Sequence, residues 1–243
     1  MMGCALTMGL AACDTVVDSG SAPAARPSGP PVQGMSPAEG RSAFAAVTRV
    51  VEPVSERECR ARTEGLNCDF LIRIDPDPNA PPNAYQSQDR SGRPVITFTQ
   101  RMLGQIANRD ELAFVMSHEA AHHIRGHLAR KRQSAVAGSI LLAGLASVSG
   151  ASAADVARAQ DLGAVVGART YSKNFELEAD ELGTIITHKA GYRPSVGVKF
   201  FYRLPDPGDR FLDHRSQLSR FGLHPHDGGV EPLPEPPSHH VYE

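Results

Sequence analysis

Residues 111–127 read ELAFVMSHEAAHHIRGH, and this segment constrains the fold more than any other part of the chain. Its apolar residues recur with the period of a helix, and His118, Glu119 and His122 lie among them. Side chains four residues apart on a helix project within about 40° of each other, so two imidazoles can bind one metal ion. Glu119 projects about 100° from His118, where a base for a metal-activated water is needed. Because unpartnered imidazoles are costly to bury in an apolar helix, the segment predicts a metal centre.

The third ligand is expected in a second helical segment, residues 174–183, which reads NFELEADELG. Glu176 and Asp180 are four residues apart and share a face, whereas Glu178 lies about 160° from Asp180. We therefore assign Glu176 as the third ligand and Asp180 as the acceptor that orients a ligating histidine through its other ring N–H. Glu178 as the ligand is the competing assignment.

The remaining pattern predicts an α+β fold that is mostly helical with a small sheet. Helices are expected at 36–51, 108–132, 155–191 and within 195–209. Strands are expected at 68–76 and at the beginning of the segment 94–103, and a loop at 77–94. A helix that continues to residue 132 places His127 about 180° from His118, so His127 is predicted to point away from the metal.

Residues 134–154 carry no charged side chain and are long enough to span a bilayer. The segment consists mostly of Ala, Ser and Gly, and its strongly apolar part is short. We expect helical segments that pack on the domain or lie at a membrane surface, and a transmembrane helix is the alternative.

The N-terminal segment 1–13 is predicted to be a lipoprotein-type signal, because residues 10–13, LAAC, have the order of such a signal in bacteria. Cys13 would then carry the lipid, although no Lys or Arg precedes the apolar stretch. The segment 14–38 is rich in Pro, Gly, Ser and Ala and is predicted to be a flexible tether. The chain is therefore expected in the periplasm, anchored to the inner or outer membrane.

Two further cysteines, Cys59 and Cys68, flank a Gly-Leu-Asn turn. They are disulfide candidates in an oxidising compartment, and two free thiols in a cytosolic protein are the alternative. The formal net charge is -2 and no long basic stripe is present, so no nucleic-acid partner is expected.

Together these motifs resemble the zinc metallopeptidases that include the bacterial HtpX proteins, the eukaryotic CAAX prenyl proteases and the periplasmic BepA-type enzymes. The resemblance covers about residues 40–212 and is strongest to the secreted branch that does not span the membrane. It implies a zincin-like (gluzincin) fold, one Zn²⁺ ion per chain and endopeptidase activity in a domain at 39–212. The roles it implies are metal ligands at His118, His122 and Glu176, a catalytic base at Glu119, and a supporting acid at Asp180.

The substrates expected from this resemblance are unfolded or misassembled envelope proteins. The strand at 95–99, VITFT, is predicted to be the edge that borders the active-site cleft, where an extended substrate adds as a further strand. A chaperone-like or autoinhibited homologue that binds such proteins with little turnover is the alternative.

The irregular tail 213–243 departs from the family pattern, since Val230 stands where an Arg is expected after His224-Pro225. Either His224 or His214 could approach the metal.

Overall fold

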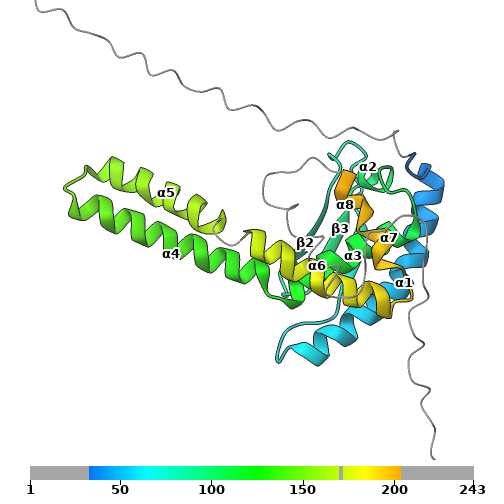
Figure 1. Ribbon diagram of the computed structural model, residues 1–243. Helices are drawn as coiled ribbons and strands as arrows, with labels where there is room; N and C mark the ends of the chain where they lie inside the picture. The colour runs from blue at the N-terminus through cyan, green and yellow to red at the C-terminus, as the bar shows by residue number, and fades with distance from the viewer. Residues whose placement is uncertain (1–32, 170–171, 204–243) are drawn as a thin grey trace, which may run out of the picture. The chain divides into compact units, whose positions relative to one another are not determined.

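The computed structural model describes residues 33–169 and 172–203 (Figure 1). The described helices are α1 (Pro37–Arg62), α2 (Gln100–Leu103), α3 (Arg109–Ile124), α4 (His127–Val148), α5 (Ala153–Arg169), α6 (Ser172–Lys189), α7 (Pro194–Gly197) and α8 (Lys199–Arg203). The described strands are β1 (Leu71–Ile74), β2 (Ala84–Gln88) and β3 (Pro94–Phe98). These elements confirm the predicted α+β fold, mostly helical with a small sheet.

Several predictions fall outside the described residues. They are the signal segment 1–13 with Cys13, the first part of the tether at 14–32, and the tail 213–243 with His214 and His224.

The sheet has the strand order β1-β3-β2, with β1 parallel and β2 antiparallel to β3. The prediction that residues 95–99 form the edge is therefore wrong, because β3 is paired on both sides and all five of its residues are buried. The edge beside it, β2, lies inside the segment 77–94 that was predicted to be a loop. Its residues AYQSQ have little apolar alternation, so only pairing with β3 makes them a strand.

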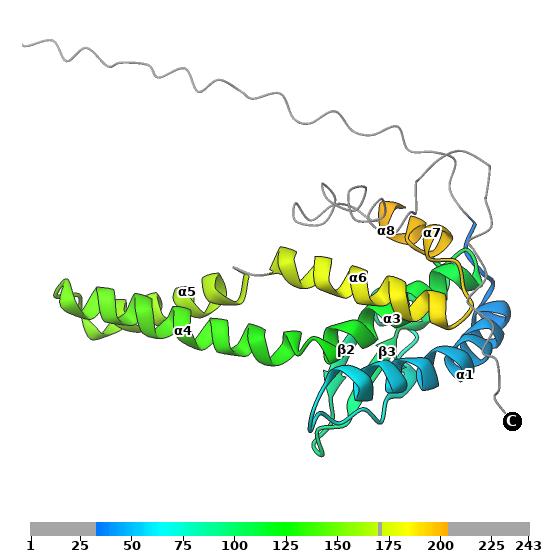
Figure 2. The same cartoon turned by 60° about the horizontal axis from the view of Figure 1, so that its bottom comes forward.

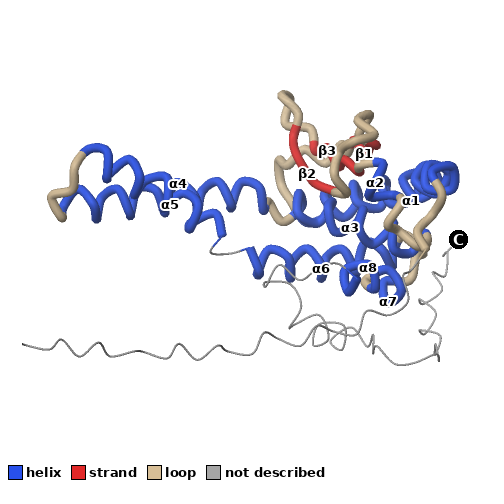
Figure 3. The backbone as a smooth tube through the Cα atoms, turned by 90° about the horizontal axis from the view of Figure 1, so that it is seen from above, coloured by secondary structure: helices blue, strands red, loops and turns tan. Residues whose placement is uncertain are grey.

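Helix α3 lies between the sheet and α6, as Figure 3 shows, and it also packs against α1. It buries 12 of its 16 residues, so its polar side chains need partners inside the protein. The helix begins at the N-cap Asn108, whose side chain accepts a hydrogen bond from the Glu111 N–H. It ends at Ile124, and Gly126 then adopts a positive φ of 67° that redirects the chain into α4.

Helices α4 and α5 form a hairpin that extends beyond the sheet and α6 (Figure 1). The two helices approach closely at glycines, because a Cβ atom on Gly163 would lie 2.2 Å from the carbonyl oxygen of Gly138. Large apolar side chains instead lie outside the contact, including Ile140, which is 68% exposed, and Val148, which is 85% exposed. Across the described residues, no helix combines the length and apolarity needed to cross a membrane. The predicted helical structure of 134–154 is confirmed, but α4 packs mainly against α5 and not on the rest of the domain.

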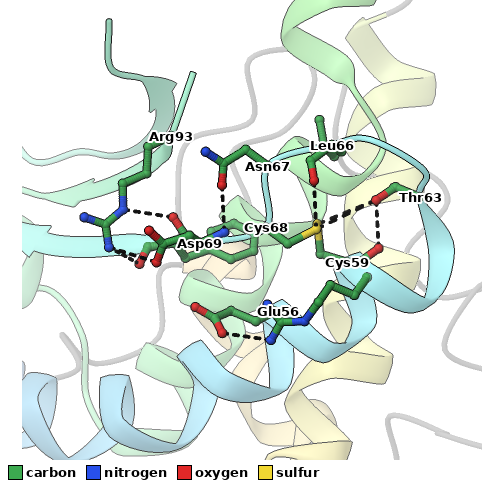
Figure 4. A network of polar contacts seen from close by, with 10 residues as sticks. Glu56, Cys59, Thr63, Leu66, Asn67, Cys68, Asp69 and Arg93 are labelled. Carbon is green, nitrogen blue, oxygen red and sulfur yellow. Dashed lines mark hydrogen bonds and ion pairs between the residues drawn. A yellow bond between two sulfur atoms is a disulfide. The ribbon is translucent and has the colours of Figure 1, made fainter. Parts of the chain in front are cut away.

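Cys59, in the last turns of α1, and Cys68, shortly before β1, are joined by a disulfide with Cα atoms 5.7 Å apart (Figure 4). The hydroxyl of Thr63 donates to the carbonyl of Cys59 at 2.8 Å within the closed loop. The carbonyl of Asn67, in the same loop, accepts a hydrogen bond from His123 Nε2 at 2.7 Å. The loop is thereby attached to α3 at the residue that follows His122.

Candidate metal centre

His118 and His122 on α3 and Glu176 on α6 come together in the structure, with ligand atoms that all lie within 4.8 Å of one another. Figure 2 shows α3 and α6 running alongside each other. They pack closely at Gly183, where an added Cβ atom would lie 3.1 Å from the Cα of His118. A larger residue there would push α6, and Glu176 with it, away from the two histidines.

The three side chains fit a zinc ion. Two atoms that bind zinc tetrahedrally at about 2.0–2.1 Å are about 3.3 Å apart. Here the two Nε2 atoms are 3.0 Å apart, and the Glu176 oxygens lie 3.4 Å from His118 Nε2 and 3.6 Å from His122 Nε2. Two imidazoles and one carboxylate form a donor set typical of catalytic zinc, which keeps a further position for water or substrate.

His118 is the most deeply buried of the three, with 2% of its surface exposed. Its Nδ1–H donates to Asp180 Oδ1 at 2.9 Å, which leaves Nε2 directed at Glu176. Burial opposes a charged ring, but the hydrogen bonds and negative charges of Asp180 and Glu176 raise the pKa of His118 to about 10. The two carboxylates beside this ring therefore stabilise a positive charge at the site, either a proton on the ring or a metal ion.

The other predicted residues of the site occupy the expected elements. Asp180 is buried on α6 beside His118, and Glu119 is half-buried on α3, one residue beyond His118. Helix phase therefore placed Glu176 and Asp180 on the face of α6 that meets the histidines.

The prediction that His127 points away from the site is wrong. Its Nδ1 lies 2.8 Å from Nδ1 of His122, and its ring is only 4% exposed. The prediction assumed one helix through residue 132, whereas the positive φ of Gly126 ends α3 and turns His127 back toward His122. A glycine immediately before His127 was the sequence signal for this break.

Glu178 is not positioned as a ligand in place of Glu176. Its carboxylate contacts His127 Nε2 at 3.1 Å and Arg130 at 2.6 Å. The competing assignment of Glu178 is therefore not favoured by the geometry, although the residue lies close to the site.

Phe201, on α8, covers the buried side of the site, with its ring centroid 5.1 Å from that of His118. The helix that carries Phe201 is fixed by Arg203, which contacts both carboxylate oxygens of buried Glu111 at 2.6 Å. Sequence reasoning missed this wall because its contacts join segments far apart in the chain.

A model of peptidase family M48 matches residues 43–231, well over half of the chain. The chain belongs to peptidase family M48. The family expected from the His-Glu-x-x-His and Glu-x-x-x-Asp motifs is thus confirmed, and the match extends past residue 212 into the tail.

The curated relatives match shorter parts of the chain than the family model does. A Vibrio cholerae protein whose name describes a beta-barrel assembly-enhancing protease is 32% identical over 141 residues, 47% of this chain and 28% of its own length. The beta-barrel assembly-enhancing protease of Yersinia pestis is 28% identical over 151 residues, 49% of this chain and 29% of its own. The mitochondrial metalloendopeptidase OMA1 of Saccharomyces cerevisiae is 31% identical over 152 residues, 63% of this chain and 40% of its own. The chain therefore spans less than half the length of each of these relatives.

Proposed function

We propose that this M48 chain is a zinc-dependent endopeptidase of the bacterial cell envelope that hydrolyses peptide bonds in unfolded or misassembled proteins. The observation that carries the proposal is the convergence of His118, His122 and Glu176 beside Glu119. A carboxylate next to such a donor set is what metal-assisted peptide hydrolysis requires.

In this proposal His118, His122 and Glu176 hold the zinc ion, and Asp180 fixes the ring of His118 so that Nε2 faces the ion. Zinc, when bound, supplies a Lewis acid that acidifies water and polarises the substrate carbonyl. Glu119 accepts the proton of the attacking water and later delivers it to the leaving amine. Buried apolar residues of α3 and the ring of Phe201 shield this side of the site from solvent.

The substrate is proposed to bind as an added strand along β2, rather than along β3 as the sequence suggested. Strand β2 packs against α3 and forms one edge of the described sheet. Thr99 N–H donates to the Asn83 carbonyl at 2.9 Å, and Asp89 N–H donates to the Arg93 carbonyl at 3.0 Å. Antiparallel pairing alternates, so the backbone groups directed away from β3 are those of Ala84, Gln86 and Gln88.

Recognition by backbone groups favours an extended chain of almost any sequence. Unfolded protein meets this requirement and compactly folded protein does not. The names of the Vibrio and Yersinia relatives, which refer to beta-barrel assembly, support envelope proteins as the substrate class. A lipid on Cys13 and a tether that ends before α1 would hold the domain near the membrane in the periplasm.

Cleavage of unfolded casein by the purified full chain tests the proposal. We expect cleavage that a chelator abolishes and zinc restores, and an approximately 10²–10⁴-fold loss of rate in Glu119→Gln. Zinc content measured on the same samples serves as the control, since Glu119→Gln should still bind one ion.

A zinc-loaded protein that ignores unfolded chains while cutting a folded partner would contradict the substrate class. If wild type and Glu119→Gln prevent client aggregation equally and neither cuts, the chain is instead a binding protein of the chaperone type.

A further inference from the structure

A group of side chains without a role in the proposed chemistry contacts His122 on its Nδ1 side, opposite the nitrogen proposed to bind the metal. His127 begins α4, Arg130 lies one turn later, and Phe175 and Glu178 belong to α6. We infer that His127, held by Glu178 and Arg130, is a positioning residue that sets the tautomer and orientation of His122 for the metal. This inference rests on the proposed zinc site.

The contacts form a continuous chain of short hydrogen bonds. His122 Nδ1 lies 2.8 Å from His127 Nδ1, and His127 Nε2 lies 3.1 Å from Glu178 Oε2. Arg130 binds Glu178 through both terminal nitrogens, at 2.6 Å and 3.1 Å. The two contacts with Arg130 therefore fix the orientation in which the Glu178 carboxylate faces His127.

Only one arrangement of protons satisfies these contacts when His122 binds a metal through Nε2. The neutral ring of His122 then carries its proton on Nδ1 and must donate it. His127 Nδ1 is the acceptor, so the proton of His127 sits on Nε2 and is donated to the Glu178 carboxylate. The orientation of Glu178 is thereby transmitted through His127 to the metal-facing nitrogen of His122.

The packing around His127 restricts its ring to the orientation that this chain needs. The ring is 4% exposed and is stacked on Phe175, with centroids 4.6 Å apart and planes inclined by 13°. The guanidinium of Arg130 lies 4.4 Å from the centroid of the same Phe175 ring. A buried and stacked imidazole cannot rotate freely, so its Nδ1 stays directed at His122.

The two ligating histidines are therefore oriented in different ways. His118 donates directly to the carboxylate of Asp180, whereas His122 reaches the carboxylate of Glu178 through an intervening imidazole. Arg130 neutralises Glu178, so this support adds no net negative charge beside Glu176 and Asp180. Orienting partners of this kind are commonly worth 10–100-fold in metal affinity.

Zinc affinity of the full chain, measured by competition with a chromogenic chelator, tests the inference without depending on peptidase activity. His127→Leu removes the acceptor for His122 and is expected to weaken zinc binding about 10–100-fold. His127→Gln keeps an acceptor oxygen and a donor amide, so it should stay within about threefold of wild type. The matched control, His188→Leu, changes an exposed histidine on α6 and should leave the affinity unchanged.

Nitrogen-15 NMR of the histidine rings in the zinc-loaded wild type provides a second measurement that needs no variant. We expect His122 to be protonated on Nδ1 and His127 on Nε2. A proton on His127 Nδ1, or a His127→Leu affinity within twofold of wild type, would overturn the inference. Failure of the wild type itself to bind zinc would instead sink the proposed peptidase function.

Discussion

Two helix pairs in this chain are built differently, although the first leads directly into the second. Helices α3 and α6 bury large side chains such as Phe114, Leu182 and Ile186 around the candidate metal centre. Helices α4 and α5 meet at glycines and leave Ile140, Leu145 and other apolar side chains exposed. Both pairs rely on close approach at glycine, but only the first removes much apolar surface from water.

The difference shows that close backbone contact and a stable core are separate properties. Glycine lets helices approach, whereas burial of large side chains supplies most of the free energy. The α3–α6 pair is thus expected to hold the ligands rigidly, while the α4–α5 pair should open at a lower free energy.

The largest difference between the two helix pairs is expected in the free energy of unfolding lost when a leucine is replaced by alanine. Leu182 on α6 is fully buried, so Leu182→Ala is expected to lower the free energy of unfolding by about 2–5 kcal/mol. Leu145 on α4 is 55% exposed, so Leu145→Ala should change it by less than about 0.5 kcal/mol. Urea denaturation of the metal-free protein measures both, and equal losses would remove the distinction between the pairs.

Valine substitutions at one glycine of each pair should distinguish local opening of a helix pair from destabilisation of the whole domain. Gly183→Val forces a side chain against the backbone of His118 and is expected to cost about 1–3 kcal/mol of global stability and to weaken zinc binding. Gly163→Val clashes with Gly138 in the hairpin, so it should remove hydrogen-exchange protection from α4 and α5. The urea midpoint of the remaining domain should stay near that of wild type. A Gly163→Val protein that unfolds as a whole would show that the hairpin is part of the cooperative core.

The smallest predicted effect is a loss of folding stability at acid pH. Burial opposes ionisation of Glu58 on α1, but contacts with Lys189 and Arg62 lower its pKa below the usual 4.5. Because the folded pKa is depressed, this stabilisation is present above pH 4.5 and is lost as the pH falls through the folded value. Both cations are partly exposed, so we expect less than about 1 kcal/mol.

A matched acid on the hairpin provides the control for this pH dependence. Hydrogen bonding to Ser152 and pairing with Arg158 also lower the pKa of Asp155, which is exposed. Because the hairpin is expected to open separately from the core, Asp155 should contribute little to the global transition. Urea titrations between pH 3 and 6 should therefore show reduced acid sensitivity in Glu58→Gln and little of that change in Asp155→Asn. The reverse order would place the acid-sensitive contact on the hairpin.

Helix phase, together with the need of buried polar side chains for partners, selected the residues that converge in the candidate site. The spacing of His118 and His122, and that of Glu176 and Asp180, places each pair on one face, and a shared need for partners indicated that the faces meet. These relations are local, so the sequence contains them. The structure brings the four side chains together, and their metal-binding roles stay a prediction.

The errors arose where a single backbone conformation or a distant contact decides the structure. The predicted direction of His127 assumed that the helix continues through Gly126, but the positive φ of Gly126 ends the helix and changes that direction. Strand β2 has a loop-like composition, and its pairing with β3 is a tertiary event. The order of the sheet likewise depends on which strands meet, which periodicity along one strand does not specify.

The left-handed turn at Gly126 links the α4–α5 hairpin to the candidate metal centre. His127 is the first residue after this turn and contacts His122, so a tilt of α4 about Gly126 would be passed to His122 through His127. The direction of the hairpin and the orientation of His122 are therefore set by the same pair of neighbouring residues, Gly126 and His127.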